Sequence, residues 1–221
     1  YEADILLKRE DLTPVRSYKI RGAFNAMTNA MKGRETSPLF VCASAGNHAQ
    51  GVAFMCKYLG VRGRIFMPVT TPSQKIMKTK TFGGDLIEIK LVGDYFDETL
   101  AAAKAYCEAE HGIFLPPFDA EDVIMGQSTV AAEIEEQLGQ APDLIVLPVG
   151  GGGLSAGVTS YFGGETHYAF IEPSGGACLA AAQEAGKPVP LARVDSFVDG
   201  AAVAEIGQLT FEKLRPYKDE V

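Results

Sequence analysis

The hydrophobic residues of this chain follow two alternating patterns. Short apolar runs alternate with longer segments in which apolar residues recur every three or four positions. The short runs are typical of β-strands, and the longer segments are typical of amphipathic helices. From residue 39 onward the two kinds alternate strictly, which is the signature of βαβ units on a parallel sheet. We therefore predict an α/β fold in which helices cover both faces of parallel or mixed sheets.

The same pattern sets the expected elements. Strands are predicted at residues 4–8, 39–43, 64–67, 86–92, 113–115, 143–149 and 168–171. Helices are predicted at residues 18–31, 47–59, 72–82, 95–110 and 123–138, then from a glycine-rich loop to about 162, and at 177–185 and 208–215. The run at 143–149 is almost wholly apolar, as expected of a central strand that is buried on both faces.

These elements divide into two domains. We expect a small domain at residues 32–122 and a large domain built from residues 1–31 and 123–221 together. The chain opens on Tyr1 without an initiator methionine, and no closing element is evident at Val221. We therefore expect the large domain to be incomplete at both ends.

Composition and charge narrow the class of protein. The chain has 221 residues, of which 47% are hydrophobic and 22% are charged, as in ordinary soluble globular proteins. The net charge is −8 and the basic residues are scattered, which argues against a nucleic-acid partner. No apolar run is long enough to cross a membrane. The four cysteines lack the spacing of a zinc site or a redox pair, so we expect no metal and a reducing cytoplasmic compartment.

Lys19 is the first candidate for chemistry. The proline at position 14 keeps the preceding backbone extended, and Ser17 is expected to cap the helix that follows. Lys19 then falls in the first helical turn, where the positive end of the helix dipole disfavours an ammonium group. A depressed pKa would make its amine a nucleophile. By itself, however, this stretch is much more typical of a solvated surface lysine.

Two loops that join strands to helices are the other candidates. Residues 44–51 carry a glycine and an asparagine at a strand-to-helix turn, where exposed N–H groups can bind an anion such as a carboxylate. Gly150–Gly153 are four consecutive glycines between a strand and a helix, a place where phosphate commonly binds. Neither the dinucleotide-binding fingerprint nor the Walker loop is present. A well-capped turn and a plain tight loop are the alternative interpretations.

The three candidates point to one cofactor if they meet. Ligands of parallel α/β sheets bind at the carboxyl ends of the strands, where both loops lie. A reactive lysine, an anion site and a phosphate site in one crevice suit a phosphorylated carbonyl compound that forms a Schiff base. Pyridoxal phosphate is that cofactor.

At this point the sequence resembles a known family. The matching stretches, in the same order and spacing, are S-Y-K-I-R-G-A at 17–23, A-S-A-G-N-H-A-Q-G at 43–51 and P-V-G-G-G-G-L at 148–154. They resemble the motifs of the threonine dehydratases, which belong to the tryptophan-synthase-β-like group of pyridoxal phosphate enzymes. The stretch F-V-D-G-A-A-V at 197–203 is similar to the biosynthetic members. The resemblance covers essentially the whole chain and implies the two-domain fold of that group.

The resemblance also implies roles for individual residues. Lys19 would hold the cofactor as a Schiff base, and Tyr18 would lie beside its ring. Asn47 would donate a hydrogen bond to the 3′ oxygen of the ring. The residues implied in phosphate binding are Gly150, Gly151, Gly152, Gly153 and Leu154. Those implied in binding the substrate carboxylate are Ser44, Gly46, Asn47 and His48.

The implied reaction is the deamination of L-threonine, and also of L-serine, to 2-oxobutanoate or pyruvate and ammonia, as the first step towards isoleucine. Lys19, released by the substrate, would remove the α-proton. The implied partners are a small amino-acid substrate and further copies of the same chain, in a dimer or a tetramer. The residue that faces the pyridine nitrogen in this family would lie beyond residue 221.

Several alternatives stay open. Serine racemases resemble this chain but carry a serine at the position of Ala45, and alanine cannot move a proton. Their divalent-metal site is also doubtful here, because Glu172 matches one ligand but Cys178 replaces an aspartate. Serine dehydratase, threonine synthase and cysteine synthase are neighbouring enzymes. A binding protein with this fold and no catalytic activity is the alternative from another class.

Overall fold

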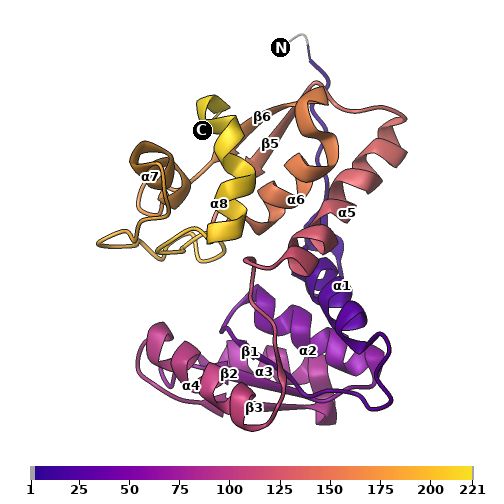
Figure 1. Cartoon of the computed structure of the whole chain (residues 1–221), viewed down its shortest axis with the longest axis vertical. Coiled ribbons are helices and arrows are strands. Elements are labelled where there is room, and N and C mark those ends of the chain that lie inside the picture. Colours follow the sequence, from indigo (N-terminus) through magenta and orange to yellow (C-terminus); the bar gives the residue numbers. More distant parts are fainter. Residues whose placement is uncertain (1–2, 221) are drawn as a thin grey trace.

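The computed structural model describes residues 3–220, with the side chains of residues 3–217. Figure 1 shows two α/β units stacked along the long axis of the molecule. One unit contains β1 to β4, and the other contains β5 and β6. Helices α1 and α5 lie where the two units meet. Within the described residues, no helix is long and apolar enough to cross a membrane.

The first unit is a four-stranded parallel sheet. Its strands, in the spatial order β3-β2-β1-β4, are β1 (Phe40–Ala43), β2 (Gly63–Met67), β3 (Ile87–Leu91) and β4 (Ile113–Phe114). Its helices are α2 (Asn47–Leu59), α3 (Ser73–Gly83) and α4 (Phe96–Ala109). Alternate residues of β1 point to opposite faces. Cys42 packs in a core shared with α2, whereas Val41 packs in a separate core shared with α4, so helices cover both faces of the sheet.

The second unit is built on a pair of parallel strands. They are β5 (Leu144–Pro148) and β6 (His167–Ile171). The helices packed in the same core are α6 (Gly153–Phe162), α7 (Cys178–Ala185) and α8 (Gln208–Leu214). Short 3-10 turns span Glu10–Leu12, Gly84–Leu86, Gly163–Glu165 and Arg215–Glu220. Every strand pair in the described chain is parallel, as the hydrophobic pattern predicts.

Helix α5 (Glu121–Leu138) belongs to both cores. Val123 is buried in the core of the first unit, and Ile124 is buried in the core of the second. Helix α1 (Lys19–Met31) crosses α5 so closely that a Cβ atom on Gly126 would lie 2.5 Å from the Cα of Gly22. Helix α6 approaches α5 in the same way, because a Cβ on Gly157 would lie 2.7 Å from the carbonyl oxygen of Ile124. Glycines therefore allow α5 to touch both neighbouring helices backbone to backbone.

A charge network ties the N-terminal segment to these helices. The Arg21 guanidinium donates to both carboxylate oxygens of Glu10 at 2.8 Å and to both of Glu133 at 2.7 and 2.8 Å. Lys8 donates to Glu133 at 2.7 Å. The hydrogen bonds from Arg21 lower the pKa of Glu133 to about 2. Arg21, which lies in the lysine motif, thus serves to hold residues 8–10 against α1 and α5.

Every predicted element from residue 18 onward is present within two residues of its expected bounds. Helix α2 has the predicted bounds and ends at Gly60, whose φ of +69° is left-handed. The predicted strand at residues 4–8 is wrong. Ile5, Leu6 and Leu7 are exposed, and no strand of the described chain lies beside them. Apolar character alone does not make a strand without a neighbour to pair with.

The prediction that residues 143–149 are buried on both faces is also wrong. Burial alternates along β5: Ile145 and Leu147 are buried, whereas Leu144 and Val146 are more than half exposed. The helices of this unit cover only one face of the strand pair. The division into domains at residues 32 and 122 stays a prediction.

We predict that the α1–α5 crossing does not tolerate a side chain. Gly126→Ala places a Cβ against the backbone of α1, which cannot move aside as a side chain can. The substitution should lower the free energy of unfolding by about 1–3 kcal/mol, although alanine is the better helix former. Chemical denaturation measures the change. Gly164→Ala is the matched control, because nothing lies within 4 Å of its added Cβ. Equal stability of the two variants would contradict the prediction.

Candidate functional site

Lys19 is the first residue of α1 and lies at the junction of the two units. Its Nζ donates to the carbonyl oxygen of Pro117 at 2.7 Å. The same atom lies 5.5 Å from the centre of the Tyr18 ring and 5.8 Å from that of Phe118. Burial lowers the pKa of Lys19 to about 8. A substantial fraction of the amine is therefore uncharged, and hence nucleophilic, at slightly alkaline pH.

The turn before α1 is stabilised by contacts other than the predicted Ser17 cap. Ser17 does not cap the helix; Tyr18 occupies the N-cap position, and no side chain caps it. Instead the Thr13 hydroxyl accepts from the Ser17 N–H and donates to the Ser17 carbonyl, both at 2.9 Å. This pair fixes the turn that precedes Lys19. The Ser17 hydroxyl is buried and has no hydrogen-bond partner.

The second predicted loop joins β1 to α2 and reaches α1. Asn47 is exposed as the first residue of α2, and Gly46, not Asn47, is at the N-cap. The Ser44 hydroxyl accepts from the Gly46 N–H at 3.2 Å. A Cβ on Gly51 would lie 3.2 Å from the carbonyl carbon of Lys19, so the first turns of α2 and α1 are in contact. The N–H groups that begin α2 thus lie close to Lys19.

The His48 side chain is committed to the protein. Its Nε2 lies 2.9 Å from the Leu115 carbonyl, which can only accept, so Nε2 carries the proton. Burial, and next the positive charge of Lys19, lower the pKa of His48 to about 3, against the effect of that hydrogen bond. The ring is therefore neutral and cannot pair as a cation with a carboxylate. Only the backbone N–H of His48 is left to bind an anion at the start of α2.

The third predicted loop is the glycine run before α6. Gly152 has a φ of +84°, a conformation that glycine adopts without strain, and α6 begins at Gly153. Gly151 lies against Phe118, because an added Cβ would come within 2.3 Å of its ring. The glycines thus allow another part of the protein, the Phe118 ring, to approach the loop closely. The N–H groups at the start of α6 face the end of the loop, where an anion can bind.

The segment Pro117–Asp119 connects all of these parts. Pro117 accepts from Lys19, and the Phe118 ring lies 5.8 Å from that amine and packs against Gly151. Asp119 accepts from the first backbone N–H groups of α8 at 2.9–3.1 Å. No sequence pattern singles out this segment, because its role comes only from contacts made far along the chain. The one local sequence feature that marks this segment is the pair of prolines at 116 and 117.

Residues 197–203, which form the fourth stretch of the resemblance, lie against the glycine run. A Cβ on Gly150 would lie 3.1 Å from the Cα of Ala201. Lys75 of α3 forms an ion pair with Asp199 at 2.9 Å, so this segment also touches the first unit. Phe197 is 92% exposed.

Buried polar atoms without partners flank each of the three loops. They are the hydroxyl of Ser17 beside Lys19, Oε1 of Gln50 in the first turn of α2 and the hydroxyl of Ser155 in the first turn of α6. Buried polar groups normally have a hydrogen-bond partner, so a buried polar atom without one is a sign that a ligand or water binds there. Together with the pKa of Lys19 and the helix N-termini, they fit a polar, phosphate-bearing ligand.

Glu172 and Cys178, the two positions compared with the racemase metal site, both form hydrogen bonds within the protein. Both carboxylate oxygens of Glu172 accept backbone N–H groups at the start of α7, at 2.8 and 2.9 Å. Cys178 is fully buried, and its thiol donates to the Gly150 carbonyl at 3.3 Å. Glu172 thus satisfies the first N–H groups of α7, and Cys178 points inward.

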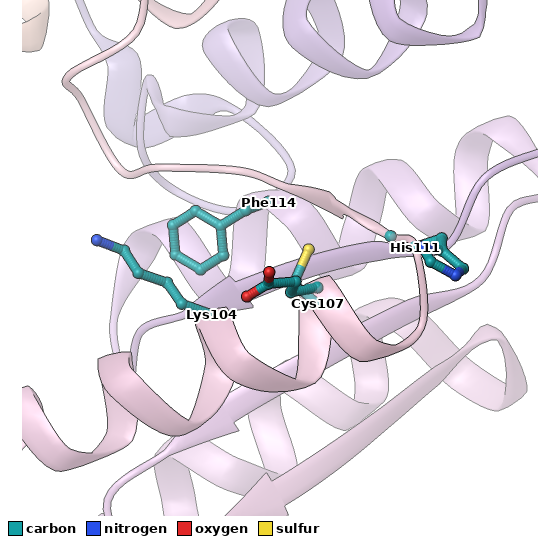
Figure 2. Close-up of a pocket in the computed structure, with 6 residues that line it drawn as sticks. Lys104, Cys107, His111 and Phe114 are labelled. Atoms are coloured by element: carbon teal, nitrogen blue, oxygen red, sulfur yellow. The ribbon is translucent and has the colours of Figure 1, made fainter.

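A pocket of about 550 Å³ lies elsewhere, between α4 and β4 (Figure 2). Its lining includes Cys107 and His111, which could suggest a nucleophile and a base. Figure 2 shows the His111 ring turned away from the Cys107 sulfur. Burial raises the pKa of the Cys107 thiol, which makes it a weaker nucleophile. This pocket therefore lacks the arrangement that nucleophilic catalysis needs.

Comparison with known proteins identifies the family of the chain. The whole chain, residues 1–221, matches the family described as "Pyridoxal-phosphate dependent enzyme". The chain belongs to this family. Its cofactor is accordingly pyridoxal phosphate, as the candidate site implies. The family match does not assign the individual residues that hold it.

The most similar proteins include threonine-deaminating enzymes. The chain is 47% identical over 224 residues to the biosynthetic L-threonine dehydratase of Bacillus subtilis, covering 100% of this chain and 53% of that protein. It is 40% identical to threonine deaminase isoform 2 of Solanum lycopersicum, with a TM-score of 0.85 over 94% of this chain and 60% of that one. Maize serine racemase is 28% identical, with a TM-score of 0.87 over 96% and 64%. The chain spans about half the length of the curated relatives it matches.

We predict that Lys19 reacts with aldehydes at unusually low pH, because only the uncharged amine attacks. Its rate of modification by pyridoxal phosphate, followed by peptide mapping, should rise with pH about a midpoint near 8. A Lys19→Met variant gives the background from the other lysines. A midpoint near the ordinary value of 10.5 would contradict the effect of burial.

Proposed function

We propose that this protein is a pyridoxal-phosphate dependent threonine dehydratase (threonine ammonia-lyase). It would convert L-threonine to 2-oxobutanoate and ammonia, and L-serine to pyruvate and ammonia. The observation that carries the proposal is the environment of Lys19. Its amine has a pKa of about 8, the backbone of Lys19 lies against α2, and the Phe118 ring lies near the amine and against the glycine run. The names of the Bacillus subtilis and Solanum lycopersicum relatives favour threonine as the substrate.

The proposed roles of the binding residues follow from their places in the fold. The N–H groups of Gly150–Gly153 and Leu154 would bind the cofactor phosphate, favoured by the dipole of α6. Tyr18 would lie beside the cofactor ring, and Asn47, exposed at the start of α2, would donate to its 3′ oxygen. The dipole of α2 would hold the substrate carboxylate at Ser44, Gly46, Asn47 and His48. For His48 this contact would use the backbone N–H, because its ring is engaged with Leu115.

The proposed catalytic residue is Lys19. Bound pyridoxal phosphate supplies an electron sink for the charge left when the substrate loses its α-proton. Lys19 would take that proton as a free amine. A pKa of about 8 suits this task, because a general base works best when its pKa lies near the working pH. The carbonyl of Pro117, at 2.7 Å, would hold the resulting ammonium. The rings of Tyr18 and Phe118 would keep water from the amine.

The alternatives lack a supporting observation. Racemisation needs a second acid or base on the face opposite the lysine, and Ala45 offers none at the position where racemases resemble this loop. A binding protein would have no need for a partly buried lysine with a lowered pKa. Threonine synthase and cysteine synthase need a site for a second or a phosphorylated substrate. Nothing in the described residues favours such a site.

Three further expectations belong to this proposal. The small domain at 32–122 would carry the substrate loop, and the large domain at 1–31 and 123–221 would carry the lysine and the glycine run. A homo-oligomer, a dimer or a tetramer, stays a prediction. So does the cytoplasm, for which the support is that all four cysteines are free and buried.

The test is the reaction itself. We expect the purified protein, supplied with pyridoxal phosphate, to form 2-oxobutanoate from L-threonine, measured by a coupled dehydrogenase assay. Lys19→Ala should abolish this activity, because Lys19 is the base that takes the α-proton in this proposal. L-serine should yield pyruvate without D-serine, and added sulfide or homoserine phosphate should yield no new product. Formation of D-serine, or retention of activity in Lys19→Ala, would overturn the proposal.

A further inference from the structure

Two carbonyl oxygens of the glycine run accept hydrogen bonds from buried side chains. The Thr210 hydroxyl of α8 donates to the Gly151 carbonyl at 2.8 Å. The Cys178 thiol of α7 donates to the Gly150 carbonyl at 3.3 Å. Both side chains are completely buried, so water cannot replace either donor. Helices α7 and α8, which follow the glycine run in the sequence, therefore each anchor one of its carbonyl groups.

These bonds also fix the direction of the N–H groups. A peptide unit is planar and trans, so the N–H of each residue points opposite to the carbonyl of the residue before it. Holding the Gly151 carbonyl against Thr210 therefore turns the Gly152 N–H away from α8. Holding the Gly150 carbonyl against Cys178 likewise turns the Gly151 N–H away from α7. Glycine backbones are otherwise free to rotate, which makes such anchors effective.

Helix α8 is itself held in place at the site. Asp119 accepts from the N–H groups of Gln208, Leu209 and Thr210 at 2.9–3.1 Å. Asp119 follows Phe118, which packs against Gly151. An added Cβ on Gly152 would lie 3.0 Å from the Thr210 Cβ, so the contact between the glycine run and α8 is tight. The position of Thr210 is thus set by the segment that also meets Lys19.

We propose that Thr210, assisted by Cys178, is a positioning residue that orients the N–H groups of the glycine run toward the cofactor phosphate. This inference rests on the proposed phosphate-binding role of that run. Thr210 does not touch the phosphate; it fixes in advance the backbone that does. Preorganised donors bind an anion more tightly because no ordering is needed at the moment of binding. Cys178 has the smaller effect because a thiol is a weak donor.

The test compares two ligands that differ only in the phosphate. Dissociation constants for pyridoxal phosphate and for pyridoxal are measured by equilibrium dialysis with the wild type, Thr210→Val and Thr210→Ser. Thr210→Val keeps the side-chain shape but leaves the Gly151 carbonyl unpaired. It should weaken pyridoxal phosphate binding about tenfold, the effect of losing one buried hydrogen bond, and leave pyridoxal binding unchanged. Thr210→Ser, which keeps the hydroxyl, should bind both ligands as the wild type does.

Each result decides between the proposals. An equal loss for both ligands, or no loss for either, would overturn the role of Thr210. If Thr210→Val does not fold, Cys178→Ala decides alone: it should weaken pyridoxal phosphate binding selectively, and an unselective change would overturn the inference. A wild type that binds the two ligands equally would instead contradict the phosphate site of the proposed function.

Discussion

The backbone contact between α1 and α5 is the constraint on which the site depends. At Gly22 and Gly126 neither helix has a side chain to keep the other away, and a single added Cβ would lie 2.5 Å from backbone. Lys19 begins α1 less than one turn before this crossing. At the same stretch of α5, residues 124–128, Gly157 of α6 allows a similarly close approach, and α6 begins at the end of the glycine run. Helix α5 thus sets the separation between the Lys19 amine and the glycine run.

The segment Pro117–Asp119, which precedes α5, contacts both the Lys19 amine and helix α8. Because Pro117–Asp119 leads directly into α5, its place is fixed by the same crossing. Its backbone carbonyl meets the Lys19 amine, and its carboxylate holds α8 against the glycine run. The lowered pKa of Lys19 comes from burial, with no neighbouring charge among its causes. The rings of Tyr18 and Phe118, 5.5 and 5.8 Å from the amine, form part of this environment.

Local features of the sequence predict much of the fold and of the site. The alternation of strand and helix periods locates the elements from residue 18 onward, since these periods reflect which face of each element is buried. Contacts between distant segments escape such reasoning: Phe118 and Thr210 carry no motif, and their importance lies in what they touch. The wrong predictions for two apolar runs have a related cause. Residues 4–8 form no strand, and the strand at 143–149 is buried on one face only. A run of apolar residues shows a preference for burial, not which neighbour provides it.

The central claim is that Lys19 is the residue that holds pyridoxal phosphate. The most direct measurement is to load the purified protein with the cofactor, reduce it with borohydride so that the cofactor is fixed on its lysine, and locate the label by peptide mass spectrometry. We expect one labelled peptide, with the label on Lys19, and no specific label in Lys19→Ala. A label on another lysine, or no label in the wild type, would contradict it.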